Sequence, residues 1–286
     1  EVRLAGQVDA VFIDPARRAG PGAASARQAH RYKAGTSEPP LDWCLALTSQ
    51  VEAVCIKAAP GIPVELIPRD WEAEFIAEAR DLKEAVLWSP SLASAPDGGR
   101  GPRRATVLTP SPSGHAPHTQ PHTQPHMLPH TLVAHAGDPL PLREPGEYLL
   151  DPNPAVTRAG LVEDLARHLG AQLARDLGGH LGGHPGGDIA KIDPQIAFLT
   201  LDRDVRTPFA RTLRVKHSAP WHEKQFAKRL RELEVGSVDI RRRGLAGDVE
   251  QIRRRLKLAG KTRATIVITR VNDKPWGLIC VDPDGA

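Results

Sequence analysis

The N-terminal part of the chain contains two short apolar runs that are separated by a helical stretch. The first run, residues 8–13, stops at Asp14 and Pro15, and the second, residues 51–57, stops at the sequence AAPGIP. Residues 41–49 between them have the pattern of a helix. A continuous apolar run predicts a strand buried on both faces. The order strand, helix, strand then predicts an α/β fold with a parallel sheet.

The residues that follow these two strands are candidates for a functional site, because open α/β sheets bind ligands beyond the carboxyl ends of their strands. Asp14 is either an active-site acid or a cap of the next segment. Arg17 and Arg18 are either solvated loop charges or contacts to a substrate phosphate. Lys57, near the end of the second strand, could pair with a loop carboxylate or with an anionic substrate.

Length and composition indicate a globular protein. The 286 residues, of which 40% are hydrophobic, suffice for one large or two ordinary domains. No apolar run approaches the roughly 18–20 residues that span a bilayer, so we expect no membrane segment and a cytoplasmic location. Three widely spaced cysteines without a CxxC pair predict reduced thiols, and no metal site. The chain begins with Glu1, and its single methionine, Met127, lies in a Pro/His tract; we therefore expect part of the first domain to be missing.

The middle of the chain is less regular. Residues 71–89 split around Arg80 and Asp81 into two apolar runs, and residues 103–110 add a third, which predicts antiparallel strands at a sheet edge. Residues 111–142 are rich in Pro and His, which argues against a helix or a packed sheet and predicts a disordered or extended insertion. Its histidines have no fixed geometry for a metal. Residues 143–204 are expected to connect the domains through a helix at 154–168 and a Gly-rich insertion that is not a phosphate loop.

The C-terminal part has the alternation of a compact α/β module. Its expected order is a strand, a helix, a strand, a helix and a hairpin: 211–219, 222–233, 236–244, 247–258, and 263–271 with 276–282. From Pro208 to Ala286 there are 18 Lys and Arg against 9 Asp and Glu. This excess of positive charge favours a polyanionic partner.

Six blocks resemble, in order, a bacterial family of class I S-adenosylmethionine-dependent methyltransferases with a C-terminal THUMP-like domain. They are DAVFIDPARR, IKAAPGIP, EAVLW, DPNPAVTRAGL, VGSVDIRRRG and RATIVITRV. The resemblance implies that residues 1–110 are the distal half of a Rossmann-like methyltransferase sheet, whose first three strands are absent, and that residues 205–286 are a small α/β THUMP-like domain that binds RNA. It also implies S-adenosylmethionine as the cofactor.

The same resemblance places Asp14, Pro15, Ala16 and Arg17 in the catalytic loop, with Asp14 beside the cofactor. Methyl transfer is an in-line displacement, so an enzyme gains by holding the nucleophile in line and by accepting its proton where needed. In related amino-methylating enzymes this loop reads Asp or Asn, Pro, Pro, aromatic. Ala16 and Arg17 depart from that pattern, which argues against N-methylation of a base.

The arginines of the C-terminal module are candidates for contacts to RNA phosphates. Arg241, Arg242 and Arg243 precede Gly244, and Arg254 and Arg255 follow nearby. They are either ordinary exposed charges or a phosphate-binding face. The module has few aromatic residues, so stacking on bases is not its expected mode. Two alternatives remain: a non-enzymatic nucleic-acid-binding protein, and a methyltransferase that acts on a protein or a small molecule.

Overall fold

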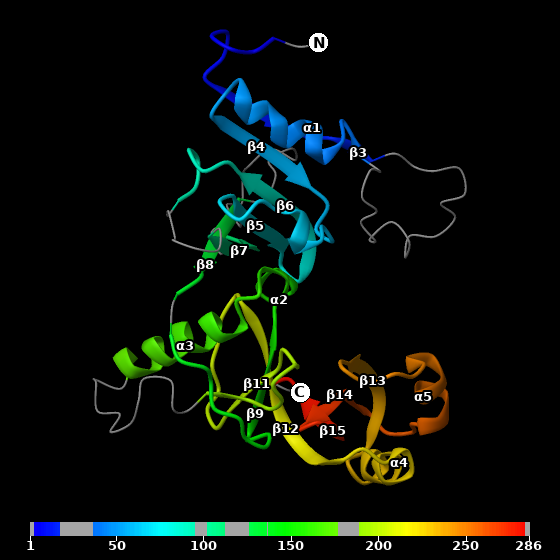
Figure 1. Cartoon of the computed structure of the whole chain (residues 1–286). Coiled ribbons are helices and arrows are strands. Elements are labelled where there is room, and N and C mark those ends of the chain that lie inside the picture. Colours follow the sequence, from blue (N-terminus) through cyan, green and yellow to red (C-terminus); the bar gives the residue numbers. More distant parts are fainter. Residues whose placement is uncertain are drawn as a thin grey trace, which may run out of the picture. The chain divides into compact units, whose positions relative to one another are not determined.

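The structure, a computed structural model, describes residues 3–17, 37–94, 102–111, 126–135, 137–176 and 189–283. The chain divides into two compact units (Figure 1). Unit 1 comprises Glu1–Ala136 and Asn153–Leu161, and unit 2 comprises Gly137–Pro152 and Val162–Ala286. Within the described ranges, no helix has the length and apolar character needed to cross a membrane.

Unit 1 is built on a six-stranded mixed sheet with the order β1-β4-β6-β5-β7-β8. The strands are β1 (Ala10–Ile13), β4 (Ala53–Ala58), β5 (Glu72–Glu78), β6 (Asp81–Trp88), β7 (Arg103–Pro110) and β8 (Met127–Val133). Helix α1 (Leu41–Ala46) continues as the 3₁₀ turn η1 (Leu47–Ser49), and a second 3₁₀ turn, η2, spans Val64–Leu66. Helix α2 (Pro154–Ala159) packs against β5 and β7, and the short strands β2 (Ala16–Arg17) and β3 (Ser37–Glu38) form a separate ribbon.

The expected strand, helix, strand unit is confirmed. Strand β1 pairs in parallel with β4, with Ile13 opposite Ile56, and helix α1 lies between them in the chain. The predicted hairpin is also present, since β5 and β6 are antiparallel. Strand β7, however, is parallel to β5, so the three closely spaced strands are antiparallel only in part.

The prediction that residues 8–13 form a strand buried on both faces is wrong for this structure. Strand β1 starts at Ala10, and its residues alternate between exposed and half-buried. The side chain of Phe12 is 66% exposed. The reason is that β1 is an edge strand of the described sheet and pairs only with β4. Strand β4 has a neighbour on each side, and its Val54, Cys55 and Ile56 are buried in succession.

The helix expected at 154–168 is two helices. Gly160 has φ 76° and ends α2 in the left-handed conformation, which Gly adopts without steric cost. A second helix, α3 (Val162–Asp176), then begins and belongs to unit 2. The sequence pattern concealed this break because the apolar residues on either side of Gly160 keep a helical spacing.

Residues 111–142 were expected to be disordered or extended and not part of a sheet. The exclusion of a sheet is wrong for residues 127–133, which form strand β8 antiparallel to β7. Pro129 is tolerated there because β8 is an edge strand. The histidines between 112 and 125, and the Gly-rich segment at 178–187, lie outside the described residues.

Unit 2 is built on a seven-stranded sheet with the order β10-β11-β9-β12-β15-β14-β13. The strands are β9 (Tyr148–Pro152), β10 (Ala190–Lys191), β11 (Leu199–Leu201), β12 (Ala210–Pro220), β13 (Val235–Arg242), β14 (Thr262–Val271) and β15 (Lys274–Val281). Helices α4 (Glu223–Glu232) and α5 (Val249–Leu256) complete the C-terminal module. All five elements predicted after residue 205 are therefore present. Asn272 and Asp273, with φ 47° and 66°, turn the hairpin as a type I′ turn requires.

The sheet of unit 2 is packed on both faces. Ala264, Ile266 and Ile268 of β14 join one cluster with Phe226 of α4 and Leu256 of α5, and Figure 1 shows these two helices beside β13. Val267 and Val271 of the same strand join a second cluster on the opposite face, because successive strand residues point to opposite faces of the sheet. That second cluster includes Ile192, Ile196 and Phe198. Strands β9, β10 and β11 also belong to this sheet. Most of the segment 143–204 is therefore part of unit 2, whereas we expected it to be a connection between the domains.

Candidate active site and basic surface

The carboxyl ends of β1 and β4 meet at one edge of the sheet in unit 1, because the two strands are parallel and adjacent. The loop that begins with Asp14 leaves this edge after β1, and the loop that begins with Ala59 leaves it after β4. Two loops at the carboxyl ends of neighbouring parallel strands form the place where this class of sheet binds ligands.

Asp14 and Lys57 form an ion pair at this edge. The Lys57 ammonium donates a hydrogen bond to Asp14 Oδ2 at 3.1 Å and also contacts Glu84 Oε2 of β6 at 3.3 Å. The side chains of Asp14, Lys57 and Glu84 are 55%, 36% and 29% exposed. Lys57 was expected to pair either with a loop carboxylate or with an anionic substrate, and the structure contains the pair with a loop carboxylate.

The pairing determines the charge state of Lys57. The hydrogen bond from Lys57 to Asp14, followed by that to Glu84, raises the pKa of the lysine above its usual 10.5. Lys57 is therefore an ammonium at neutral pH and cannot act as a base. The ion pair holds Asp14 from one side and leaves the Asp14 side chain 55% exposed.

The remaining residues of the candidate catalytic loop are only partly described. Pro15 is half-buried, and Ala16 and Arg17 form β2, with Ala16 opposite Glu38 and Arg17 opposite Ser37. Arg18 lies outside the described residues. The structure thus brings Asp14 together with Lys57 and does not place Arg18.

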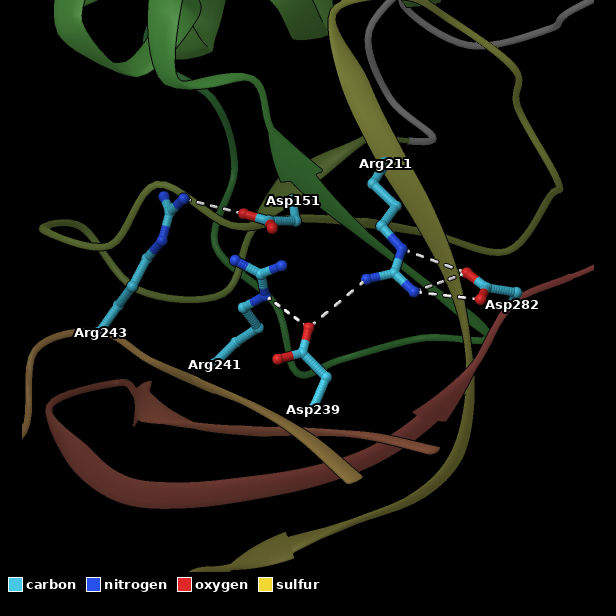
Figure 2. A network of polar contacts seen from close by, with 6 residues as sticks. All are labelled: Asp151, Arg211, Asp239, Arg241, Arg243 and Asp282. Atoms are coloured by element: carbon cyan, nitrogen blue, oxygen red, sulfur yellow. Dashed lines mark hydrogen bonds and ion pairs between the residues drawn. The ribbon is translucent and has the colours of Figure 1, made fainter. Parts of the chain in front are cut away.

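The three consecutive arginines of unit 2 all have partners within the protein, and Figure 2 shows the contacts of Arg241 and Arg243. Arg243 donates to Asp151 Oδ1 at 2.8 Å, and its guanidinium lies 4.8 Å from the ring centroid of Phe198. Arg241 Nε donates to Asp239 Oδ2 at 3.0 Å. Arg242 donates to the Leu245 carbonyl at 2.9 Å.

Asp239 is shared between two arginines. Its Oδ2 also lies 3.9 Å from Arg211 Nη1, and Arg211 makes hydrogen bonds to both carboxylate oxygens of Asp282 (Figure 2). Residues 241–243 were expected to be either ordinary exposed charges or a phosphate-binding face. The structure shows all three with partners inside the protein, and a contact to phosphate stays a prediction. Their carboxylate and carbonyl partners come from β9, β13 and the following turn, and the more distant of these partners could not be found from local sequence.

Between the last turn of α5 and the start of β14, positively charged side chains are exposed. Arg254, Lys257, Lys261 and Arg263 are exposed, and within the described parts of the chain none of them makes an ion pair. We call these four residues the α5 surface. Arg255 is also exposed, but its guanidinium lies 3.6 Å from Glu223. Of the arginines in the C-terminal module that were expected to contact RNA, Arg254 is the one for which the described residues show neither an ion pair nor a hydrogen bond to a carbonyl.

The three cysteines are free and buried, as expected for packing residues. Burial raises the pKa of Cys55 to about 11 and that of Cys280 to about 12. A thiol must lose its proton to act as a nucleophile or a metal ligand, so neither residue is a candidate for catalysis.

Sequence reasoning did not identify Glu84 and Arg158. Glu84 reaches Lys57 because β6 inserts between β4 and β5, with Lys57 opposite Val86; no local pattern predicts that insertion. Arg158 donates hydrogen bonds to carbonyls of the loop after β4. It lies inside the block DPNPAVTRAGL, so a signal for it was present in the sequence.

Comparison with known proteins connects this geometry to a class of enzyme. The chain is 32% identical over 269 residues to uncharacterized S-adenosylmethionine-dependent methyltransferases from two strains of Mycobacterium tuberculosis. The alignment covers 91% of this chain and 60% of each relative, so the chain spans less than two thirds of their length.

Two further comparisons concern the fold and the C-terminal module. A crystal structure from Porphyromonas gingivalis, of a protein proposed to be a methyltransferase, shares the fold with a TM-score of 0.57 at 19% identity, over 95% of this chain and 59% of that one. Residues 210–281 match the family model for a THUMP domain-like segment. The expected resemblance is thus confirmed: the chain is similar to S-adenosylmethionine-dependent methyltransferases and carries a THUMP-like domain at its C-terminal end.

Proposed function

We propose that the intact protein is an S-adenosylmethionine-dependent methyltransferase that acts on RNA, with Asp14 in its catalytic loop. The observation that carries this proposal is the Asp14–Lys57 pair at the carboxyl ends of two adjacent parallel strands. The similarity to named methyltransferases supports the reaction class, and the THUMP-like segment supports an RNA substrate.

Asp14 would act on the nucleophile. Its carboxylate can accept a hydrogen bond from the attacking group and hold that group in line, while Lys57 fixes the carboxylate and Glu84 fixes Lys57. Positioning and proton acceptance by one such group contribute about 10² to 10⁴ in rate.

The charge at this edge fits the proposed cofactor. Asp14, Lys57 and Glu84 together carry one net negative charge, and Asp14 is more than half exposed. S-adenosylmethionine, when bound, supplies an electrophilic methyl group on a cationic sulfonium, and a carboxylate suits that charge. Among the residues that the structure describes, we assign the contact with the cofactor to Asp14.

The α5 surface would hold the RNA backbone. Four exposed cations within ten residues of sequence attract phosphates without reading bases. This contact would position the RNA and leave the choice of nucleotide to the catalytic unit.

The test is mass spectrometry of RNA nucleosides from cells with and without the gene, followed by complementation with the wild type and with Asp14→Ala. We expect one methylated nucleoside to disappear on deletion, to return with the wild type, and to stay absent with the variant. An unchanged nucleoside profile would contradict RNA methylation. Methyl transfer to protein or to a small molecule instead would keep the reaction class and replace the substrate.

A further inference from the structure

A second set of contacts joins the candidate active edge to a helix about a hundred residues later. Arg158, on α2, donates from Nε to the Pro60 carbonyl at 2.9 Å and from Nη2 to the Ile62 carbonyl. Its guanidinium carbon also lies 5.8 Å from the ring centroid of Phe75. One side chain thus binds two carbonyls of the loop that follows β4.

Helix α2 holds Arg158 in a defined place. Asn153 is fully buried, accepts a hydrogen bond from the Ala155 amide at 3.0 Å, and donates one to the Ala79 carbonyl at 2.6 Å. The first contact caps the helix and the second attaches it to the end of β5. Val156 and Ala159 are buried, so the helix cannot rotate without exposing apolar surface.

The loop at 59–63 is a tight turn whose carbonyls need partners. The Ile62 amide donates to the Ala59 carbonyl at 3.0 Å, and the Ile62 side chain is fully buried. A carbonyl that loses its partner in a partly buried turn costs free energy, so the turn would open without the guanidinium. The turn begins two residues after Lys57, the residue that orients Asp14.

We infer that Arg158 is a positioning residue for methyl transfer: by holding the carbonyls of Pro60 and Ile62 it fixes the end of β4, and with it Lys57 and Asp14. This inference rests on the function proposed above. Arg158 does not touch the reacting atoms, and its effect passes through the loop. A small displacement of the group that aligns the nucleophile can cost about 10²-fold in rate.

Arg104 provides a matched control within the same unit. It is also a partly buried arginine with two polar partners, Glu72 at 2.9 Å and Glu74 at 2.8 Å, and it lies 5.4 Å from the ring of Trp88. Its ion pairs are with carboxylates on β5. Among the described residues, Arg104 makes no contact with the loop at 59–63. Arg104→Gln therefore removes the polar contacts of another partly buried arginine without touching that loop, and it costs more stability because the Glu72 carboxylate that it leaves is only 1% exposed.

The experiment compares Arg158→Gln, Arg158→Lys and Arg104→Gln in the intact protein. Hydrogen exchange, measured by mass spectrometry, follows the amides of residues 59–67. Initial rates of methyl transfer are measured with methyl-labelled S-adenosylmethionine and total RNA from a strain that lacks the gene. The melting temperature of each variant is measured in parallel.

For Arg158→Gln we expect exchange in the 59–67 segment to be about tenfold faster and kcat to fall by at least about tenfold, with KM for RNA within about twofold of the wild type. Arg158→Lys, which keeps the charge and one donor direction, should recover part of both losses. Arg104→Gln should lower the melting temperature and leave the exchange of the loop and kcat per folded molecule near the wild-type values.

Unchanged loop exchange or unchanged kcat in Arg158→Gln would overturn the inference. Equal losses of kcat in Arg104→Gln would also overturn it, since the effect would then come from general destabilisation. If the wild type transfers no methyl group to total RNA, the proposed function fails and the catalytic part of the inference fails with it. The exchange measurement decides separately whether Arg158 orders the loop.

Discussion

Arg243 and Asp151 form an ion pair between two segments of unit 2 that are distant in the sequence: Nη2 lies 2.8 Å from Oδ1, and the carboxylate is only 3% exposed. Removing one partner of such a pair leaves the other charge buried and uncompensated. Asp151→Ala should therefore lower the free energy of unfolding of unit 2 by about 2–3 kcal/mol, below the usual 3–5 because Arg243 is partly exposed. Urea denaturation measures this loss.

The pair of Arg241 and Asp239 serves as the control for that measurement. Both side chains are considerably more exposed than Asp151, and exposed pairs contribute about 0–1 kcal/mol. Arg241→Gln should therefore change the free energy of unfolding by less than about 1 kcal/mol. A loss in Arg241→Gln as large as that in Asp151→Ala would show that burial does not distinguish the two pairs.

The cysteines provide a chemical test of the described cores. Cys55 and Cys280 are buried, and their pKa values are raised to about 11 and about 12. Because the thiolate is the reactive form, a thiol reagent at pH 8 should leave both unmodified in the native protein and modify both in urea. Rapid modification of Cys280 in the native protein would contradict its place in the core of unit 2.

Elements with local signals could be predicted from the sequence. Helices α4 and α5 follow from their apolar spacing, and the β14–β15 hairpin follows from Asn272 and Asp273 between two apolar runs. The break at Gly160 was missed because a glycine inside an apolar periodicity does not by itself end a helix.

Contacts that depend on strand order could not be predicted in this way. Glu84 reaches Lys57 only because β6 inserts between β4 and β5. Arg243 reaches Asp151 only because the turn after β13 comes back to β9 across 92 residues of sequence. Local sequence therefore could not decide whether the arginines at 241–243 are ordinary exposed charges or a phosphate-binding face.

The ion pair of Lys57 has a consequence for pH. The hydrogen bonds to Asp14 and then to Glu84 raise the pKa of Lys57 above 10.5 in the folded state. Its contribution to stability is thus fully present below pH 10.5 and is lost as the pH rises through the higher, folded-state pKa. Circular dichroism of the wild type and of Lys57→Met between pH 7 and 12 should show an alkaline loss of stability that is larger in the wild type. Parallel curves for the two proteins would contradict the pairing.

The α5 surface predicts a specific salt dependence of RNA binding. Each contact between a cation and a phosphate of single-stranded RNA contributes about −0.7 to the slope of log affinity against log salt concentration. Arg254→Ala combined with Lys257→Ala should flatten this slope by about one to two units for every RNA tested, because phosphate contacts carry no sequence information. Filter binding at a series of salt concentrations measures the slope.

The control also removes two positive charges, but from arginines that already form ion pairs. Arg211→Gln with Arg241→Gln releases Asp239 and Asp282, and the slope should stay close to the wild-type value. Equal flattening in both double variants would mean that the net charge of the unit, and not the α5 surface, determines RNA binding.

Asp14 is the residue on which the proposed reaction depends most directly. Its carboxylate is exposed beyond the end of β1 and is held from one side by Lys57, so Asp14→Ala should remove the acceptor without disturbing a core. We expect turnover to fall by about 10² to 10⁴, with the melting temperature and the affinity for RNA unchanged. Asp14→Asn keeps the size and one acceptor oxygen but weakens the pairing with Lys57, and should retain intermediate activity if positioning dominates. Single-turnover methyl transfer at saturating cofactor separates this loss from a loss of binding. Activity within a few-fold of the wild type in Asp14→Ala would leave Asp14 as a cap of the segment that follows it.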